Sequence, residues 1–252
     1  MTNTETAPKN DMPLFYSKIE PVSPELHKNF KLRSEADFSY AAKTNTVPLT
    51  LPEFTLVARH YPILFIGEEL HPVAALGFGI TQNLFVDDKG QWETGAYIPA
   101  YVRRFPFILL GGSDDGGLTL GVEGTANSTA DNGRALFNAD ASPTDAINQA
   151  LDFCDQFNNA HAYTRDFCEA LKKTDIVEDR SVTVELKAGE QTNLGSFKRI
   201  NEEKFKALPD ATILEWHKKG FLHAVCFHLQ SLNNWDILLV KNGTPGSGLP
   251  QA

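Results

Sequence analysis

The chain has 252 residues, 42% of them hydrophobic, and a formal net charge of −9. This length suits one large domain or two small ones, and the apolar content is enough to build a real core. An acidic chain whose basic runs never exceed two residues lacks the clustered positive face of nucleic-acid-binding proteins. The same charge balance repels anionic membrane surfaces.

The ends of the chain predict unstructured segments. Residues 1–12 are polar and acidic, without the positive start and apolar core of a signal peptide, and we expect them to be disordered. The tail 243–252 is rich in Gly and Pro and is expected to be flexible. Apolar runs such as YPILFIG are far shorter than the roughly 20 residues that span a bilayer. We therefore expect a soluble, cytoplasmic protein with a single domain over residues 13–242 and no membrane insertion.

The half of the chain from about Leu49 to Leu120 is rich in strand signals, in runs such as TLVARHYPILFIG, VAALGFGI and NLFVDDKGQWETGAYI. The DDKG within the last run predicts a hairpin turn in which Gly90 takes a positive φ. The stretch YIPAYVRRFPFILL, over residues 97–110, is interpreted as a further strand whose side chains alternate between two faces. Short strands with tight turns favour an antiparallel sheet, open or partly closed.

The next part of the chain predicts a long helical segment. Ser142 is a good N-cap, Pro143 suits the first helical position, and no Gly or Pro intervenes from there to Lys173. Apolar residues recur at helical spacing along this segment, so that one stripe faces inward. A single helix of ~30 residues would be about 45 Å long, which exceeds a compact domain. We therefore expect a break near Asn158–Asn159.

The remaining residues predict two strands with two short helices between them. SVTVEL is the first strand, and NEEKFKAL and DATILEWHKKG are the helices, with Asn201 and Asp210 as candidate N-caps and Gly220 as a stop signal. FLHAVCFHL is interpreted as a buried strand that leads to Ser231. Together the elements predict a single α+β domain, with an antiparallel sheet in the N-terminal half and helices from the C-terminal half packed on it.

The cysteine content favours a reducing compartment. Three cysteines, Cys154, Cys168 and Cys226, leave one unpaired in any disulfide scheme. We expect buried, reduced thiols, in agreement with a cytoplasmic location.

Two adjacent arginines, Arg103 and Arg104, lie inside the most apolar stretch of the chain. A guanidinium among apolar residues is costly unless it is paired or capped, so each arginine needs an anion or an aromatic face. In the structural interpretation, Arg104 pairs within the chain and Arg103 lies over a neighbouring ring. The candidate partners are then Glu68, Glu69 or Glu123 for Arg104, and Tyr101 or Phe105 for Arg103.

In the functional interpretation, the same arginines form a binding site for an anion or a peptide carboxylate, because arginine suits bidentate recognition of carboxylates. Aromatic residues near them in the sequence would complete the contact surface. The candidate site residues are Arg103, Arg104, Tyr97, Tyr101 and Trp92. The sequence leaves both interpretations open.

Motifs of common enzyme classes are missing from the sequence. There is no GxxxxGK[ST] phosphate loop, no complete dinucleotide fingerprint and no nucleophile elbow. No cofactor is therefore expected, and no metal site is assigned. His60, Glu69 and His71 form the alternative metal set, although their spacing does not match the familiar iron triad of His-x-carboxylate with a distant His.

Several motifs together resemble the SapC family of proteobacteria. In order along the chain they are HYPILF from His60, NLFVDDKGQW from Asn83, YIPAYVRRFPF from Tyr97, LFNADASPT from Leu136, LGSFKRINEEKFKAL, and LHAVCFHLQSL with its His228 and Ser231. The resemblance covers roughly Leu14 to Lys241. One turn departs from the family pattern, because Asn138 and Ala141 replace its usual Asp and Gly, and we expect that turn to be shaped differently.

The resemblance implies a function only in outline. The family is named for surface-layer protein loci, and its genes often lie near TonB-dependent receptors and flavin-dependent halogenases, which points to nutrient uptake or peptide modification. We expect a non-catalytic accessory or binding protein with a peptide or protein partner and no nucleic acid. The alternatives are a metal-dependent oxygenase or hydrolase that uses His60, Glu69 and His71, and a structural subunit of an assembly with exposed Trp92 and Tyr97.

Overall fold

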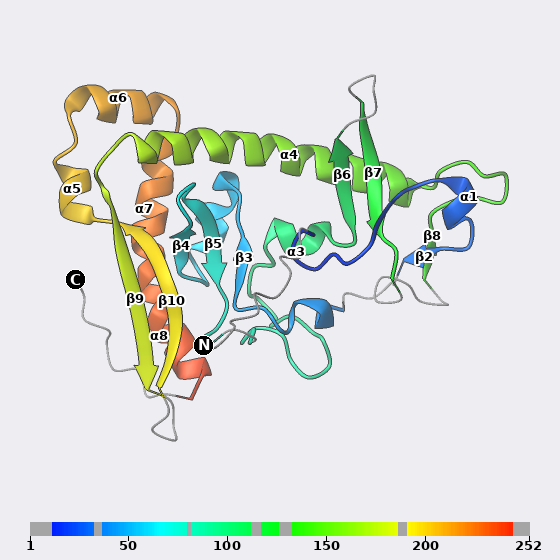
Figure 1. Cartoon of the computed structure of the whole chain (residues 1–252), viewed down its shortest axis with the longest axis horizontal. Helices are drawn as coiled ribbons and strands as arrows, with labels where there is room; N and C mark the ends of the chain where they lie inside the picture. Colours follow the sequence, from blue (N-terminus) through cyan, green and yellow to red (C-terminus); the bar gives the residue numbers. More distant parts are fainter. Residues whose placement is uncertain are drawn as a thin grey trace, which may run out of the picture. The chain divides into compact units, whose positions relative to one another are not determined.

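The computed structural model describes residues 12–32, 37–79, 82–111, 117–125, 133–185 and 191–243. Its helices and antiparallel sheets confirm the predicted α+β class, and the sheets are open rather than closed (Figure 1). Within these ranges no helix is both long and apolar enough to cross a membrane. The predicted disordered start and flexible tail lie, apart from Met12 and Gly243, outside the described residues.

The chain divides into two compact units. The first unit consists of Met1–Glu35 and Phe105–Leu151, and the second unit of Ala36–Arg104 and Asp152–Ala252. Each unit therefore combines two separate segments of the sequence. The long helix α4, Asp145–Lys172, begins in the first unit and continues into the second. The single domain expected over residues 13–242 stays a prediction.

The first unit contains a three-stranded antiparallel sheet in the order β1-β7-β6. Its elements are β1 (Ile19–Pro21), α1 (Pro24–His27), β2 (Lys31–Leu32), β6 (Phe107–Gly111), β7 (Leu118–Glu123) and β8 (Arg134–Ala135). Strands β2 and β8 pair separately. The central strand β7 has a glycine where its neighbours' side chains meet: a Cβ on Gly121 would lie 2.8 Å from Ile19 and 3.0 Å from Leu110.

The turn before α4 uses Ser142 differently from the sequence prediction. Asp140 Oδ1 accepts hydrogen bonds from the N–H and the hydroxyl of Ser142, at 3.0 and 2.6 Å. Ser142 therefore closes this turn and is not the N-cap of the helix, which begins at Asp145. Asn138 Nδ2 donates to Ser142 Oγ at 2.9 Å. Ala141 adopts φ +66°, in the left-handed region that favours glycine.

The second unit contains a five-stranded antiparallel sheet in the order β3-β5-β4-β10-β9. In that order its strands are β3 (Thr46–Pro48), β5 (His71–Ala75), β4 (Ile63–Ile66), β10 (Gln191–Ile200) and β9 (Val177–Glu185). The predicted strand SVTVEL lies in β9 and is confirmed at its described residues. Two strands from the C-terminal half thus extend the sheet, because β10 pairs with β4 at Lys198 opposite Phe65. The DDKG turn is also confirmed, with Gly90 at φ +75°.

The helices of the second unit enclose a cluster of aromatic rings. Besides α4 they are η1 (Ser39–Ala41), η2 (Leu51–Glu53), α2 (Phe54–Val57), α3 (Ala100–Arg104), α5 (Glu202–Lys206), α6 (Asp210–Lys218), α7 (Phe221–Ser231), η4 (Leu232–Asn234) and α8 (Trp235–Lys241). The ring of Phe167 in α4 lies 5.3 Å from that of Phe221 and 6.3 Å from those of Phe54, Phe65 and Trp216, between ring centroids. This cluster joins α4, α6 and α7 to the sheet.

Four predictions for the second unit are wrong. The runs on either side of the DDKG turn form no strand within the described residues 82–99, where Val86 and Trp92 make an isolated bridge. Residues 97–104 are not a strand, because α3 begins directly after Pro99. Helix α4 continues without a break through Asn158–Asn159. FLHAVCFHL forms α7 and not a strand, since an apolar run alone does not distinguish a buried helix from a buried strand.

The predicted helix boundaries near the C-terminus are mostly confirmed. Asn201 caps α5, because its side chain accepts from the N–H of Lys204. Gly220 takes φ +73° between α6 and α7, as a stop signal requires. Asp210, however, is the first residue of α6, and Pro209 occupies the N-cap position.

Candidate functional site

Arg103 and Arg104 are the last two residues of α3. Consecutive positions on a helix are about 100° apart, so the two side chains leave α3 in different directions. Arg103 is exposed, whereas only 8% of Arg104 is accessible. The predicted site therefore separates into an exposed guanidinium and a buried one.

The N-terminus of α3 is held by a carboxylate from a distant part of the sequence. Glu53 of η2 is 6% exposed, and its Oε1 accepts hydrogen bonds from the N–H of Ala100 and the hydroxyl of Tyr97. Its Oε2 accepts from the N–H and the hydroxyl of Thr50, which completes a capping box. Negative charge is favourable at a helix start because unpaired N–H groups point there. Glu53 therefore fixes both the start of α3 and the ring of Tyr97.

Tyr97 connects this buried carboxylate to Arg103. Its hydroxyl donates to Glu53 Oε1 at 3.1 Å and accepts from Arg103 Nη2 at 3.0 Å. Burial and the charge of Glu53 raise the pKa of Tyr97 to about 12, so the phenol keeps its proton at neutral pH. Arg103 Nε donates to the carbonyl of Ile98 at 3.0 Å. The guanidinium carbon lies 5.5 Å from the ring centroid of Tyr97 and 5.2 Å from that of Phe153.

The guanidinium of Arg103 is thus fixed in place and still has donors to offer. Two of its five N–H groups are used, by Ile98 and Tyr97. Within the part of the chain that the structure describes, no carboxylate forms an ion pair with Arg103. Its cation–π partners are Tyr97 and Phe153, where the sequence predicted Tyr101 or Phe105.

Arg104 lies against two aromatic rings of the interior. Its guanidinium carbon is 4.6 Å from the ring centroids of both Tyr101 and Phe157. Tyr101 is itself only 7% exposed. The structure therefore places these two predicted site residues in a buried cation–π contact, while Arg103 and Tyr97 are the part of the set that is accessible.

All three carboxylates that the sequence offers as partners of Arg104 take part in contacts of their own. Glu69 pairs with Lys172 at 2.6 Å, and Glu68 lies 4.0 Å from Lys198. Glu123 belongs to the first unit, where its carboxylate accepts two backbone N–H groups and a hydroxyl. These hydrogen bonds outweigh the effect of burial and lower the pKa of Glu123.

Trp92 supports the site through buried contacts and does not form part of its surface. It is 7% exposed, and its Nε1 donates to the hydroxyl of Tyr61 at 3.0 Å. Tyr61 in turn donates to the carbonyl of Tyr97 at 2.6 Å, and its ring lies 4.6 Å from that of Phe85. Burial raises the pKa of Tyr61, which keeps this hydroxyl a donor. The exposed Trp92 expected of an assembly interface is therefore not found.

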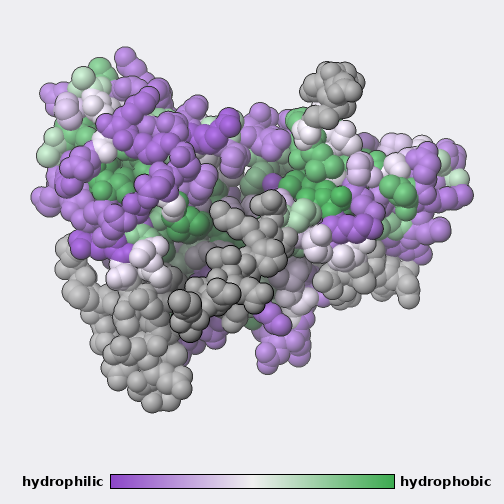
Figure 2. Space-filling model, viewed as in Figure 1, coloured by the Kyte–Doolittle hydropathy of each residue, from purple (hydrophilic) through white to green (hydrophobic). Residues whose placement is uncertain are grey.

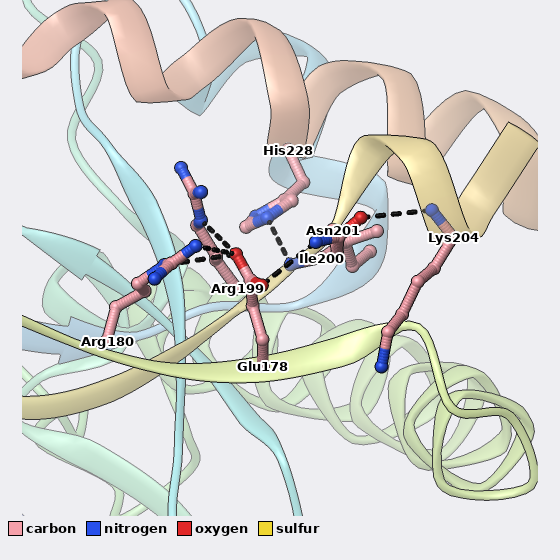
Figure 3. A network of polar contacts seen from close by, with 7 residues as sticks. All are labelled: Glu178, Arg180, Arg199, Ile200, Asn201, Lys204 and His228. Carbon is pink, nitrogen blue, oxygen red and sulfur yellow. Dashed lines mark hydrogen bonds and ion pairs between the residues drawn. The ribbon is translucent and has the colours of Figure 1, made fainter. Parts of the chain in front are cut away.

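A second polar network joins α7 to the sheet (Figure 3). His228 is fully buried, and its Nε2 accepts the N–H of Ile200 in β10 at 3.0 Å. Ser231, one helical turn later, accepts the N–H of Ile63 in β4 at 2.9 Å and donates to the carbonyl of His228 at 2.6 Å. The two residues of the LHAVCFHLQSL motif thus fasten two neighbouring strands to one helix. Both are closed off from solvent, and their role is structural.

Beside this network, Glu178 of β9 gathers two arginines (Figure 3). Its Oε1 lies 2.8 Å from Arg180 Nη2 and 2.8 Å from Arg199 Nε, and its Oε2 accepts from Asn201 Nδ2 at 2.9 Å. Burial alone would raise the pKa of Glu178, but the hydrogen bonds from Asn201 and Arg199 lower it. These arginines are neutralised within the chain, in contrast to Arg103.

The alternative metal set is not brought together. Among the described residues, no group of three or more His, Cys, Asp or Glu side chains could hold a metal ion. Glu69 is engaged by Lys172, and the ring of His60 lies 5.9 Å from that of Tyr61, between centroids. His60, Glu69 and His71 therefore gain no support as ligands.

All three cysteines are free, but they are not all buried. Cys154 and Cys168 of α4 are buried, and Cys168 Sγ donates to the carbonyl of Leu70 at 3.2 Å. Burial raises the pKa of Cys154 to about 11 and that of Cys168 to about 12. Cys226 is exposed, which corrects the expectation of three buried thiols.

Two residues that the sequence interpretation missed are essential to the geometry of the site. Glu53 carries a readable signal, because Thr50 and Glu53 have the spacing of a capping box. Phe153 has no such signal, since its contact with Arg103 joins positions far apart in the sequence.

Comparison with known proteins gives a single result. No curated protein and no solved structure matches the chain. The family model of SapC matches residues 22–238, which include both the arginine segment and the His228 network. The chain belongs to the SapC family.

Proposed function

We propose that this SapC-family chain is a non-catalytic binding protein that holds an anionic group of a peptide or protein partner on the guanidinium of Arg103. The proposal rests on one observation: the Arg103 side chain is exposed and yet held in place. It donates hydrogen bonds to Ile98 and Tyr97, and its guanidinium lies over the rings of Tyr97 and Phe153. A guanidinium held in this way loses little further freedom when it binds a carboxylate.

The charge arrangement supports the same proposal. The Glu53 carboxylate accepts four hydrogen bonds, and one of them comes from the Tyr97 hydroxyl, which itself accepts from Arg103. The tyrosine orients the arginine without neutralising it by direct contact. An incoming carboxylate therefore meets donors that are already in place, and charge-assisted hydrogen bonds of this kind are among the stronger ones in proteins.

The partner and compartment follow from the family resemblance and the thiols. A peptide partner suits a family whose genes lie near outer-membrane receptors and halogenases. Three free cysteines, one of them exposed, support a reducing compartment such as the cytoplasm. No described cluster of metal-binding side chains favours the oxygenase or hydrolase alternative.

The test follows the side-chain N–H signal of Arg103 by NMR during titration with the capped tripeptide acetyl-Ala-Glu-Ala-amide. We expect a saturable shift that the glutamine version of the tripeptide does not produce. Calorimetry with the same tripeptide should show binding that Arg103→Met abolishes. Arg59→Met, which removes an exposed arginine elsewhere in the second unit, should leave it intact. Absence of a saturable shift, or calorimetric binding of unchanged affinity in Arg103→Met, would overturn the proposal.

A further inference from the structure

We infer that the outer edge of β6 is an interface for a second copy of this chain, which pairs with it through its own β6. The β6 edge, as we name it, is the side of Phe107–Gly111 that faces away from β7. Two copies joined there form one antiparallel sheet in the order β1-β7-β6-β6-β7-β1. The β6 edge does not include Arg103, and the inference goes beyond the proposed function.

Two hydrogen bonds show which way the backbone groups of β6 point. The carbonyl of Pro106, directly before the strand, accepts the N–H of Glu123 in β7 at 2.9 Å. Because alternate residues of an antiparallel ladder bond to the same neighbour, the next residue, Phe107, faces away from β7. The hydroxyl of Tyr16 donates to the Phe107 carbonyl at 2.6 Å, in agreement with that direction. The residues that direct their N–H and C=O outward are therefore Phe107, Leu109 and Gly111.

Leu109 is the open centre of the β6 edge. The ladder with β7 does not use its N–H and C=O, and no other hydrogen bond joins them to a described residue. The side chains of Ile108, Leu109 and Leu110 are each partly exposed. In Figure 2, hydrophobic surface gathers where Figure 1 shows β6, β7 and the adjoining part of α4. A second strand would pair the backbone groups and cover apolar surface at the same time.

β6 lacks the features that protect the other sheet edges. Proline and charged side chains on an edge strand hinder pairing with another chain. Within the described sheets, β6 is the edge strand that contains neither, since its sequence is FILLG. The other edge strands each contain at least one such residue: Pro21 in β1, Pro48 in β3, Asp179 in β9, Lys31 in β2 and Arg134 in β8. This contrast indicates that a partner strand covers β6.

The β6 edge is complementary to itself. Its outward-facing residues lie symmetrically about Leu109, so in an antiparallel pair centred there the two Leu109 residues exchange both N–H···O=C bonds. The N–H of Phe107 in each copy then meets the carbonyl of Gly111 in the other. Ile108 of one copy lies opposite Leu110 of the other, and apolar cross-strand pairs of this kind stabilise a sheet. Every pair across the interface is therefore apolar.

The charges around β6 favour a second copy over an unrelated strand. The strand itself is uncharged, so two chains with a net charge of −9 meet there without like charges in contact. In the sequence, Arg103 precedes β6, and Asp114 and Asp115, which lie outside the described residues, follow it. Antiparallel pairing brings the basic start of one copy's segment toward the acidic end of the other's, and such complementarity selects the partner.

Sedimentation equilibrium of the full chain tests the inference, at concentrations up to about 0.5 mM because small interfaces associate weakly. We expect a monomer–dimer equilibrium in the wild type. Leu109→Pro removes an N–H that β7 does not use, so it should leave the fold intact and weaken dimerisation at least ~10-fold. Ile108→Pro removes an N–H directed at β7 and should instead lower the free energy of unfolding in urea. If Leu109→Pro destabilised the chain as much as Ile108→Pro, the outward direction of Leu109 would be wrong.

A second pair of variants separates the interface from the charge of the chain. Leu110→Lys places a charge opposite Ile108 of the second copy and should also weaken dimerisation ~10-fold. Leu26→Lys, at an exposed position of α1, makes the same change in net charge and should dimerise like the wild type. Circular dichroism checks that all variants fold.

The oligomeric state decides the inference. A wild type that stays monomeric overturns it, and so does a dimer that Leu109→Pro or Leu110→Lys leaves at full strength. If a monomeric wild type binds acetyl-Val-Thr-Val-Thr-Val-amide and Leu109→Pro does not, the β6 edge serves a strand of another protein. Leu109→Pro should still bind acetyl-Ala-Glu-Ala-amide, so a missing dimer and a failed Arg103 site are separate results.

Discussion

The imidazole of His228 and the backbone N–H of Ile200 lie 3.0 Å apart in a hydrogen bond that solvent does not reach. Because Nε2 is the acceptor, the neutral ring carries its proton on Nδ1. Protonation would remove the lone pair that Ile200 needs and would leave a charge in the interior. Burial accordingly lowers the pKa of His228 to about 3. The ring joins α7 to β10 only in its neutral form.

The free energy of unfolding should therefore decrease as the pH is lowered, and His228 should account for part of this decrease. An unfolded histidine has a pKa of about 6.5, so the neutral native ring contributes its full stability above that pH and loses it as the pH falls toward its native pKa. We expect a slope of about 1.4 kcal/mol per pH unit from this one proton. Urea unfolding between pH 7 and pH 4.5 measures it.

The matched variants are His228→Gln and His223→Gln. His223 lies on the same helix but is exposed, so its replacement should preserve the slope. His228→Gln should be less stable at pH 7 and should have a shallower dependence. An unchanged slope in His228→Gln would show that other groups control the acid sensitivity.

Ser231→Ala should destabilise the chain without changing its pH dependence. The substitution leaves the N–H of Ile63, now 2.9 Å from Ser231 Oγ, without an acceptor in the interior. An unsatisfied buried donor costs about 1–3 kcal/mol. Ser196→Ala, at an exposed position of β10, is the control and should change the free energy of unfolding by less than about 0.5 kcal/mol. Equal effects of both substitutions would remove the structural role assigned to Ser231.

Helix α7 shows why an apolar run was interpreted as a strand where the structure has a helix. Its buried residues recur at intervals of three and four: Phe221, Ala224, Val225, His228 and Ser231. That spacing is helical, but two of the five residues, His228 and Ser231, are polar. The remaining positions of the segment are also largely apolar, so the helical period is hidden in the sequence. The hydrogen bonds that make a buried His and Ser favourable come from strands β4 and β10. Only the tertiary structure supplies them.

The arginine site shows the same limit. The turn at Gly90 and the N-cap at Asn201 could be predicted from the local sequence, because each depends on residues within a few positions. The conformation of residues 97–104 depends instead on Glu53, which caps α3 from far away in the sequence. The predicted strand also placed Tyr97 and Arg103 on one face. In the structure Tyr97 precedes α3 and Arg103 lies within it, and the two side chains meet in a hydrogen bond.

Ala141→Gly should stabilise the first unit. Ala141 has φ +66°, a conformation that costs an alanine more than a glycine because of its Cβ. We expect a gain of about 1 kcal/mol in the free energy of unfolding, measured with urea and partly offset by the greater freedom of glycine in the unfolded chain. Ala139→Gly is the control, because Ala139 lies in the same turn without a positive φ, and it should give no gain. If Ala141→Gly were less stable than the original chain, the backbone at Ala141 would not be strained.

Glu53→Gln tests whether the buried carboxylate positions the proposed binding site. The substitution keeps the size of the side chain but removes the charge that accepts from Ala100, Tyr97 and Thr50. Hydrogen bonds to a charged group contribute about 1.5–3 kcal/mol, so unfolding in urea should become easier by about 2 kcal/mol. Glu68→Gln, whose side chain is 95% accessible, should have almost no effect.

Tyr97→Phe separates the orientation of the Arg103 guanidinium from the stability of the fold. It removes the hydroxyl that accepts from Arg103 Nη2 at 3.0 Å and leaves the ring beneath the guanidinium. Because Arg103 would still lie over two rings but lose one hydrogen bond, we expect the affinity for acetyl-Ala-Glu-Ala-amide to fall ~5-fold with a stability loss of no more than about 1.5 kcal/mol. Unchanged affinity in both Glu53→Gln and Tyr97→Phe would mean that Arg103 binds as a mobile charge, and the fixed guanidinium would then play no part in recognition.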